Sequence, residues 1–151
     1  MLLTELLAPE RVKVPLTGAS KDDLLRELVG VLGEAGAVAD ADDVLRAVRR
    51  REEELSTGNG GVAIPHGKTE SVGGLVMAAG TTRGPVEFEA LDGQPVRLFF
   101  LLVGPQSAAG QHLKALGRIA RLARRDALRE RLVEAASADE FMAVLAEAES
   151  T

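Results

Sequence analysis

Apolar positions in the first third of the chain predict one short strand followed by two helices. Residues 12–16 form a short segment that suits a strand and is followed by Thr17-Gly18. Helical spacing then begins after Ser20, a good N-cap, and is expected to stop at Gly36. The apolar residues that recur at this spacing are Leu24, Leu25, Leu28, Val29 and Leu32. A second helix is expected from near Asp40 to residue 54, with its apolar residues on one side.

The middle of the chain has the pattern of a β-sheet. Strands are expected over residues 75–82, 86–88 and 96–103. Gly84-Pro85 and Asp92-Gly93 lie between them, and both pairs are typical of turns. Residues 98–103 are apolar without alternation, which predicts a central strand covered on both faces.

The last third returns to helical spacing. One apolar stripe is formed by Leu113, Leu116, Ile119, Ala120 and Ala123. Residues 137–140 have the sequence of a capping box ahead of Phe141. The order of helices, strands and helices predicts an α+β fold built in layers. No linker or internal repeat divides the sequence, so we expect a single domain over residues 1–151.

Composition limits the chemistry that the chain can perform. It has no Cys and two His, with 18 Lys and Arg against 23 Asp and Glu. The absence of Cys excludes disulfides and thiolate nucleophiles, and two histidines without a close carboxylate motif make a poor zinc site. The net charge of −5 argues against nucleic acid as the main partner. His66 and His112 are therefore the first candidates for chemistry near neutral pH.

No segment suggests export or membrane insertion. The N-terminus lacks the basic region and the long apolar core of a secretory signal. The longest apolar run, residues 98–103, is far shorter than the roughly 20 residues needed to span a bilayer. We therefore expect a cytoplasmic protein with no direct insertion into the membrane.

A glycine-rich stretch leads directly to His66. The sequence is Ser56-Thr57-Gly58-Asn59-Gly60-Gly61-Val62-Ala63-Ile64-Pro65-His66-Gly67. Pro65 fixes the backbone and Gly67 leaves the ring uncrowded, so the ring is expected at a strand end, beside backbone N–H groups free to meet an anion. The glycines match neither a P-loop nor a dinucleotide-binding pattern. The alternative is a hydrophilic turn with one exposed histidine.

His112 stands near the start of the helix expected in the last third. Helix N-termini attract anions and disfavour a protonated imidazole. If the fold brings His112 beside His66, the two could share a phosphoryl group, one covalently and one by hydrogen bond. The alternative is a surface or half-buried histidine with no partner. The charged run at residues 49–54 has, by itself, the pattern of a solvated helix end.

Several separated motifs occur in the order and spacing of one known family. They are Arg51-Glu52, Ser56-Thr57-Gly58, Ala63-Ile64-Pro65-His66-Gly67, the run from Phe88 to Val96, and His112-Leu113-Lys114-Ala115-Leu116. Together they resemble the enzyme IIA domains of the fructose/mannitol class of the bacterial phosphoenolpyruvate-dependent sugar phosphotransferase system. This class includes the nitrogen-regulatory IIA proteins. The resemblance extends from about Leu7 to Glu147.

The resemblance implies a role for three residues. His66 matches the histidine that accepts a phosphoryl group from the phosphocarrier HPr and later donates it to a IIB component. His112 matches the second active-site histidine, expected to hydrogen-bond the phosphoryl oxygens or the phosphorylated ring. Arg51 matches the arginine that lies near the phosphoryl group. The glycine loop is one residue shorter than the usual form, so Arg50 takes this role if the gap falls elsewhere, and Gly117 replaces a serine common in the family.

The resemblance also implies the arrangement of the layers and the chemistry. The expected fold is a three-layer α/β/α sandwich around a mixed sheet, with His66 and His112 close together at one edge. Phosphoryl transfer needs an in-line nucleophile and donors that offset the charge of the equatorial oxygens. Neutral imidazole is a competent nucleophile, and Arg51, His112 and the loop N–H groups would supply the donors. No bound metal ion or other cofactor is then required.

Two roles fit a phosphohistidine carrier of this kind. The first is carbohydrate uptake, in which a IIB component receives the phosphoryl group and couples it to a membrane transporter. The second is a free-standing regulatory IIA protein, whose phosphorylation state controls its binding to other proteins. A third hypothesis is a binding-only descendant in which His66 is never phosphorylated. In each case we expect partners to dock on apolar surface around the site.

Overall fold

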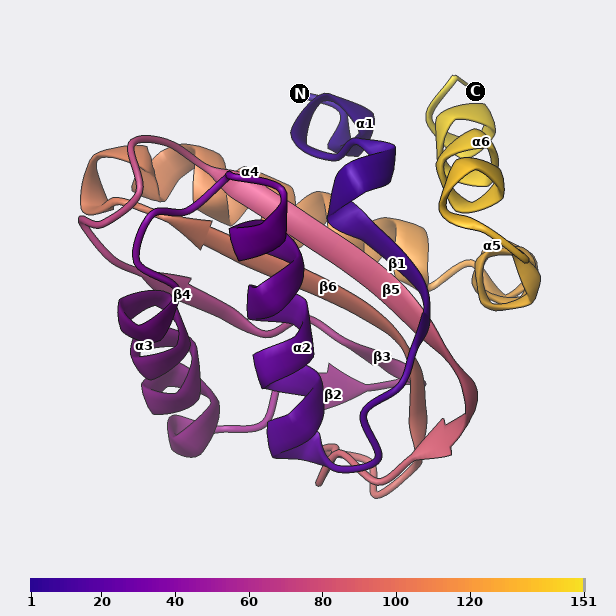
Figure 1. Ribbon diagram of the computed structural model, residues 1–151. Coiled ribbons are helices and arrows are strands. Elements are labelled where there is room, and N and C mark those ends of the chain that lie inside the picture. Colours follow the sequence, from indigo (N-terminus) through magenta and orange to yellow (C-terminus); the bar gives the residue numbers. More distant parts are fainter. Residues whose placement is uncertain (151) are drawn as a thin grey trace.

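The computed structural model describes residues 1–150 and shows six helices and six strands in three layers (Figure 1). The helices are α1 (Leu3–Leu6), α2 (Lys21–Glu34), α3 (Ala41–Glu54), α4 (Ala109–Ala123), α5 (Asp126–Glu134) and α6 (Ala138–Glu149). The strands are β1 (Val12–Leu16), β2 (Gly58–Asn59), β3 (Val62–Ala63), β4 (His66–Lys68), β5 (Val76–Val86) and β6 (Val96–Gly104). Two short 3-10 helices span Pro9–Arg11 and Gln106–Ala108.

The strands form one mixed sheet, which confirms the predicted fold class. Its order is β1-β5-β6-β3-β2, and β4 pairs with β6 beyond the end of β3. β1 runs parallel to β5, whereas β5 and β6 are antiparallel. Both β3 and β4 run parallel to β6, and the short hairpin of β2 and β3 closes the far edge. β6 is therefore the central strand, as the unbroken apolar run predicted.

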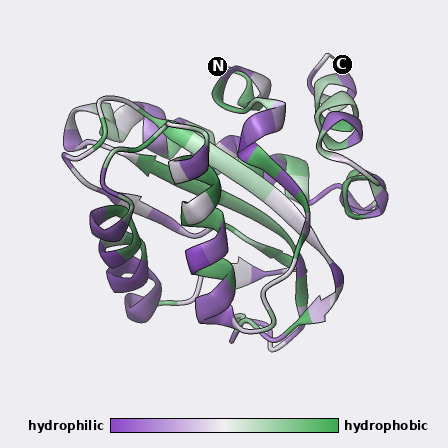
Figure 2. Ribbon diagram, viewed as in Figure 1, coloured by the Kyte–Doolittle hydropathy of each residue, from purple (hydrophilic) through white to green (hydrophobic). Residues whose placement is uncertain are grey.

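Helices cover both faces of the sheet. Figure 1 shows α2 and α3 in front of the sheet and α4 behind it. Along β6, Phe99, Leu101 and Val103 join the core under α2 and α3. Leu98 and Leu102, which alternate with them, join the core under the other helices. A strand with one core on each face has no polar side, and the ribbon coloured by hydropathy is accordingly green along β6 (Figure 2).

The predicted helix starts agree with the structure. The Ser20 hydroxyl accepts a hydrogen bond from the amide of Asp23, and the Asp40 carboxylate accepts one from the amide of Asp43. Ser137 caps α6 in the same way. Each cap satisfies an amide that the first helical turn leaves without a partner. These caps fix where α2, α3 and α6 begin.

The turn predicted at Gly84-Pro85 and the separate strand predicted over residues 86–88 are both wrong, because β5 continues through Gly84 and Pro85 and ends at Val86. The pairing with β6 shifts register between Thr81 and Val86, which is where the ladder is interrupted. Arg97 occupies the gap by donating hydrogen bonds to the carbonyl of Thr82. A proline lacks an amide to donate, so it is tolerated where regular pairing has already stopped.

Four short elements of the structure were not predicted from the sequence. They are helices α1 and α5 and strands β2 and β4.

Within residues 1–150, no helix combines the length and the apolar character needed to cross a membrane.

Candidate active site

The first candidate residue, His66, begins β4 and pairs with Leu102 of β6. Its Nδ1 atom lies 2.8 Å from the carbonyl oxygen of Ile64. A carbonyl can only accept a hydrogen bond, so in the neutral ring Nδ1 carries the proton. The lone pair is then on Nε2. The backbone around Pro65 thus selects one tautomer and leaves Nε2 as the ring nitrogen with a free lone pair.

The second candidate, His112, lies in the first turns of α4 against His66. Their ring centroids are 5.5 Å apart, at an interplanar angle of 68°. His112 is only 2% exposed, and neither of its ring nitrogens has a hydrogen-bond partner among residues 1–150. Buried polar atoms without partners are costly, so these two nitrogens have hydrogen-bonding capacity that the described residues do not use. The structure therefore brings together the two histidines that the sequence singled out.

Both histidines are neutral near pH 7. Burial lowers the pKa of His66, and the charges of Arg51 and Lys68 lower it further, against opposing effects of the Ile64 hydrogen bond and Glu52. Burial chiefly lowers the pKa of His112, from 6.5 to about 4, with smaller contributions from His66 and Lys68. A neutral His66 keeps its lone pair for attack. A neutral His112 can still donate one N–H.

The lowered pKa of His112 predicts a pH-dependent stability. The unfolded chain takes up a proton below the ordinary pKa of 6.5, and the folded chain does so only near pH 4. The stabilisation is therefore complete above pH 6.5 and is lost as the pH falls toward 4. We expect the free energy of unfolding to drop by about 2 kcal/mol between pH 7 and pH 5. Urea unfolding at both pH values tests this, and His112→Gln should remove most of the difference; an equal drop in this variant would contradict the assignment.

Arg51 lies at the end of α3, where its Nη1 atom donates a hydrogen bond of 2.9 Å to the carbonyl of Leu55. Its charge is one of those that lower the pKa of His66, whereas Arg50 is exposed and has no such effect. Of the two arginines, Arg51 is therefore the one whose charge acts on His66. Lys68 is a second cation at the site that sequence reasoning missed, although its place two residues after His66 on the same strand was a usable signal.

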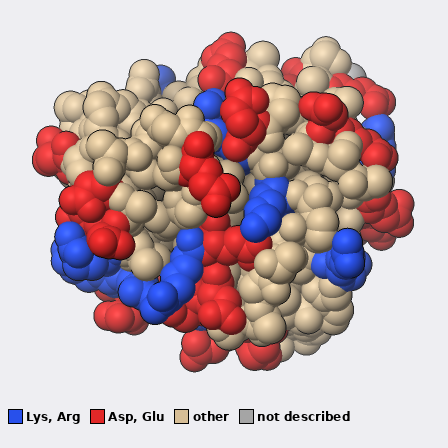
Figure 3. Space-filling model, viewed as in Figure 1, with Lys and Arg blue, Asp and Glu red and all other residues tan. Residues whose placement is uncertain are grey.

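Other arginines of α3 form surface ion pairs, but Glu52 is buried, so the solvated helix end predicted for residues 49–54 holds only in part. Arg49 makes two hydrogen bonds of 2.8 Å to Asp22 of α2, and Arg46 pairs with Asp43. Figure 3 shows acidic and basic side chains side by side on the face that α2 and α3 cover. Arg51 differs from these neighbours because its guanidinium binds a backbone carbonyl instead of a carboxylate.

The glycine-rich loop does not offer the free amides that we expected. The amide of Thr57 donates to Glu52, that of Gly58 donates to Ser56, and that of Gly60 donates to Asp92. Gly60 and Gly61 have φ values of 64° and 81°, which only glycine adopts at low cost. The glycines therefore build the tight turn between β2 and β3, and these amides are already paired.

Gly67 serves a different purpose from the one inferred from its sequence. A Cβ atom at this position would lie 3.1 Å from the backbone of Ala47 and of Val48 in α3. The missing side chain therefore lets β4 approach the α3 backbone closely. This close packing holds His66, at the start of β4, near the end of the helix that carries Arg51.

Comparisons with known proteins point to one family. The family model described as "Phosphoenolpyruvate-dependent sugar phosphotransferase system, EIIA 2" matches residues 5–148. The fructose-specific EIIABC component of Bacillus subtilis is 38% identical over 96% of this chain, which spans 23% of that protein. A nitrogen regulatory protein of Bradyrhizobium diazoefficiens is 38% identical over 97% of this chain, which here spans 95% of the relative.

Solved structures share the fold over nearly the whole chain. The nitrogen regulatory protein IIA-Ntr of Neisseria meningitidis superposes with a TM-score of 0.87 at 36% identity, covering 95% of this chain and 98% of that one. The mannitol IIA of Escherichia coli, solved in complex with phosphorylated IIB, superposes with a TM-score of 0.78 at 21% identity. That match covers 93% of this chain and 97% of that one, and it shows the fold alone. The chain belongs to the EIIA 2 family, a phosphotransferase component of the phosphoenolpyruvate-dependent sugar phosphotransferase system.

Proposed function

We propose that His66 carries the phosphoryl group in this chain, on Nε2. The observation that supports this most directly is the hydrogen bond from Nδ1 to the Ile64 carbonyl, 2.8 Å long, which leaves the lone pair on Nε2. We also propose that residues 1–151 form a single domain, although residue 151 lies outside the described part of the chain. The proposed location of the protein is the cytoplasm.

The transfer step follows from this tautomer. The Nε2 lone pair attacks the phosphorus of a phosphorylated donor, in line with the bond that leaves. The new P–N bond forms as the donor's bond to phosphorus breaks, and the donor takes back the bonding pair. No proton has to leave Nε2, because the neutral ring already carries its proton on Nδ1. The positive charge that develops on the ring is stabilised by the Ile64 carbonyl.

Three side chains around His66 are suited to hold the phosphoryl oxygens. Arg51 and Lys68 are the cations that act on the ring. His112 has unpartnered nitrogens and can donate a hydrogen bond from the buried side of the site. A neutral donor is useful here, because it stabilises the bound group without adding a charge that would trap it on His66.

We propose an HPr-type phosphocarrier as the donor and a IIB component as the acceptor. The mannitol IIA of Escherichia coli, which shares this fold, was solved together with phosphorylated IIB. Two apolar side chains support docking at the site: Leu55, which is 57% exposed, and Leu113, which is 72% exposed. Leu55 holds Arg51 through its carbonyl, and Leu113 adjoins His112, so a partner that covers both would also cover the histidines.

The carrier can serve carbohydrate uptake or regulation. Sugar-specific EIIA components and nitrogen regulatory proteins both occur among the relatives. Regulation is favoured by one observation: the nitrogen regulatory protein of Bradyrhizobium diazoefficiens matches this chain over nearly its full length. In that role the phosphorylation state of His66 would control binding to other proteins.

One experiment tests the carrier function. The chain is incubated with enzyme I, HPr and labelled phosphoenolpyruvate, and the label is followed before and after a IIB component is added. We expect one acid-labile phosphate on His66 that IIB then removes. A chain that takes up no label would overturn the proposal and favour a binding-only protein, whereas stable label that no IIB removes would favour the regulatory role.

His112 is tested by rates in the two directions. Replacing it with alanine removes a buried donor but leaves the nucleophile in place. We expect His112→Ala still to accept phosphate, and to donate it to IIB on the order of tenfold to a hundredfold more slowly. Quenched-flow measurement of both half-reactions checks this, and wild-type rates in both directions would remove His112 from the mechanism.

A further inference from the structure

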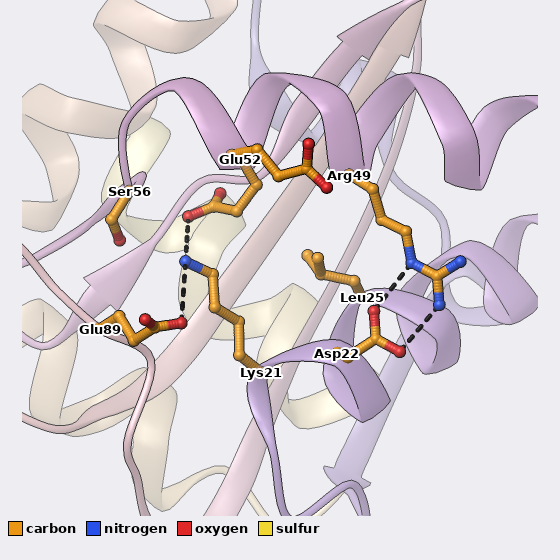
Figure 4. A pocket seen from close by; sticks show the side chains of 8 residues that line it. Lys21, Asp22, Leu25, Arg49, Glu52, Ser56 and Glu89 are labelled. Carbon is orange, nitrogen blue, oxygen red and sulfur yellow. Dashed lines mark hydrogen bonds and ion pairs between the residues drawn. The ribbon is translucent and has the colours of Figure 1, made fainter.

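The phosphoryl-transfer step does not use the buried carboxylate of Glu52, which lies close to the site in the sequence. Its side chain is 3% exposed and lies in a cleft between α2 and the end of α3 (Figure 4). Lys21 of α2 approaches it to 2.9 Å. Charged groups are costly to bury, so a buried carboxylate indicates that its hydrogen bonds are needed.

Those hydrogen bonds hold Thr57, at the start of the glycine-rich loop. The Thr57 amide donates to Oε2 of Glu52 at 2.9 Å, and its hydroxyl donates to Oε1 at 2.7 Å. Both carboxylate oxygens are therefore used, and Lys21 supplies the balancing charge. The Lys21 ammonium is itself fixed over the ring of Phe88, 5.0 Å from its centroid.

From Thr57 the hydrogen bonds continue to His66. The carbonyl of Thr57 accepts a hydrogen bond of 3.3 Å from the amide of Ile64. The carbonyl of Ile64 in turn accepts the Nδ1 proton of His66. Ile64, whose carbonyl selects the tautomer of His66, is thus hydrogen-bonded directly to Thr57, the residue that Glu52 holds in place.

A second branch leads from the same clamp to Arg51. Leu55 lies between Glu52 and Thr57 along the chain, and these two residues are joined by hydrogen bonds. The carbonyl of Leu55 accepts a hydrogen bond of 2.9 Å from the Arg51 guanidinium. If Thr57 were released, the segment after α3 would lose its anchor, and Leu55 and Ile64 would lose fixed positions together. One carboxylate therefore restrains both reactive elements of the site.

We propose that Glu52, with Lys21 as its counter-ion and Thr57 as its hydrogen-bond partner, is a positioning residue that orients His66 and Arg51 for phosphoryl transfer. This inference rests on the carrier function proposed above. Glu52 does not touch the phosphoryl group. It acts through Thr57, Ile64 and Leu55.

The test uses a pair of neighbouring carboxylates. Glu52→Gln keeps the shape of the side chain, but its amide nitrogen must face a donor of Thr57 or Lys21. Glu53→Gln is the matched control, because Glu53 lines the same cleft without a hydrogen bond in the described structure. We expect Glu52→Gln to slow phosphate acceptance from phospho-HPr by about tenfold, with the same final stoichiometry, and Glu53→Gln to behave as wild type.

A readout on the unphosphorylated chain separates positioning from transfer. Histidine NMR reports the tautomer and the pKa of His66 without any partner protein. We expect Glu52→Gln to lower this pKa, because Glu52 raises it in the wild type, and to increase exchange between the two tautomers. The NMR measurement needs no phosphate transfer, so it tests the positioning role of Glu52 even if the wild-type chain accepts no phosphate. The carrier function and the positioning role can therefore be disproved independently.

A second pair keeps the inference testable if Glu52→Gln does not fold. Thr57→Ser retains the hydroxyl that donates to Glu52, and Thr57→Val removes it. We expect Thr57→Val to reproduce the slower acceptance and the altered His66 spectrum, and Thr57→Ser to stay close to wild type. Folded variants at Glu52 or Thr57 with wild-type rates and an unchanged His66 spectrum would overturn the proposal.

Discussion

His66→Ala should accept no acid-labile phosphate from phospho-HPr. The substitution removes the nitrogen proposed to form the P–N bond. We expect His112 not to replace it, because its ring belongs to α4 and its centroid lies 5.5 Å from that of His66, away from the position that His66 offers to a donor. We expect a rate at least about a thousandfold below wild type, the scale on which removal of a covalent nucleophile acts.

The measurement is label retained after alkaline and after acid treatment, with the site mapped by mass spectrometry. Circular dichroism of His66→Ala should match wild type, because the half-buried ring adds little to either core. His112→Ala serves as the control that keeps the label. Acid-labile phosphate on a folded His66→Ala variant would place the nucleophile elsewhere, and 31P–15N coupling to Nδ1 of the wild type would contradict the assigned tautomer.

Gly80→Ala should destabilise the fold by about 3 kcal/mol. Gly80 lies in β5 and pairs with Lys13 of β1. A Cβ atom at this position would lie 2.5 Å from the Lys13 carbonyl oxygen and 2.8 Å from two side-chain atoms of Leu16. The backbone oxygen cannot move without shifting β1, so the strain spreads along the parallel pair.

Gly84→Ala is the matched control, since Gly84 is in the same strand and an added Cβ would meet nothing within 4 Å. We expect its stability to lie within about 0.5 kcal/mol of wild type. Urea unfolding of both variants gives the comparison. Equal stabilities for the two would show that β1 yields to the added methyl group at little cost.

Local patterns predicted the elements whose signals are themselves local. Ser20 and Asp40 cap helices at the expected residues, and the unbroken apolar run at residues 98–103 became the central strand. The proximity of His66 and His112 was different, because it depends on β4 pairing with β6 and on α4 returning behind the sheet. Only the family resemblance supplied that contact.

The errors arose where a tertiary contact decides what a residue does. Gly84-Pro85 carries a turn signal, yet Arg97 binds the irregular backbone there and β5 continues. The glycine loop has the composition of an anion site, yet its amides bind Glu52, Ser56 and Asp92, two of which lie five or more residues away. Neither partner can be identified from spacing along the chain.

The place of β4 in the sheet has a consequence for the order of events during folding. His66 pairs with Leu102 of β6 and contacts His112 of α4, so two later elements must be in place before the nucleophile is oriented. Contacts between distant parts of a chain form late, because loop closure precedes them. A nascent chain whose α4 is still inside the ribosome therefore has the His66 side chain but not the site. Under the proposed carrier function, we therefore expect phosphate acceptance only after both helical layers have closed on the sheet, so that the phosphate would label folded molecules.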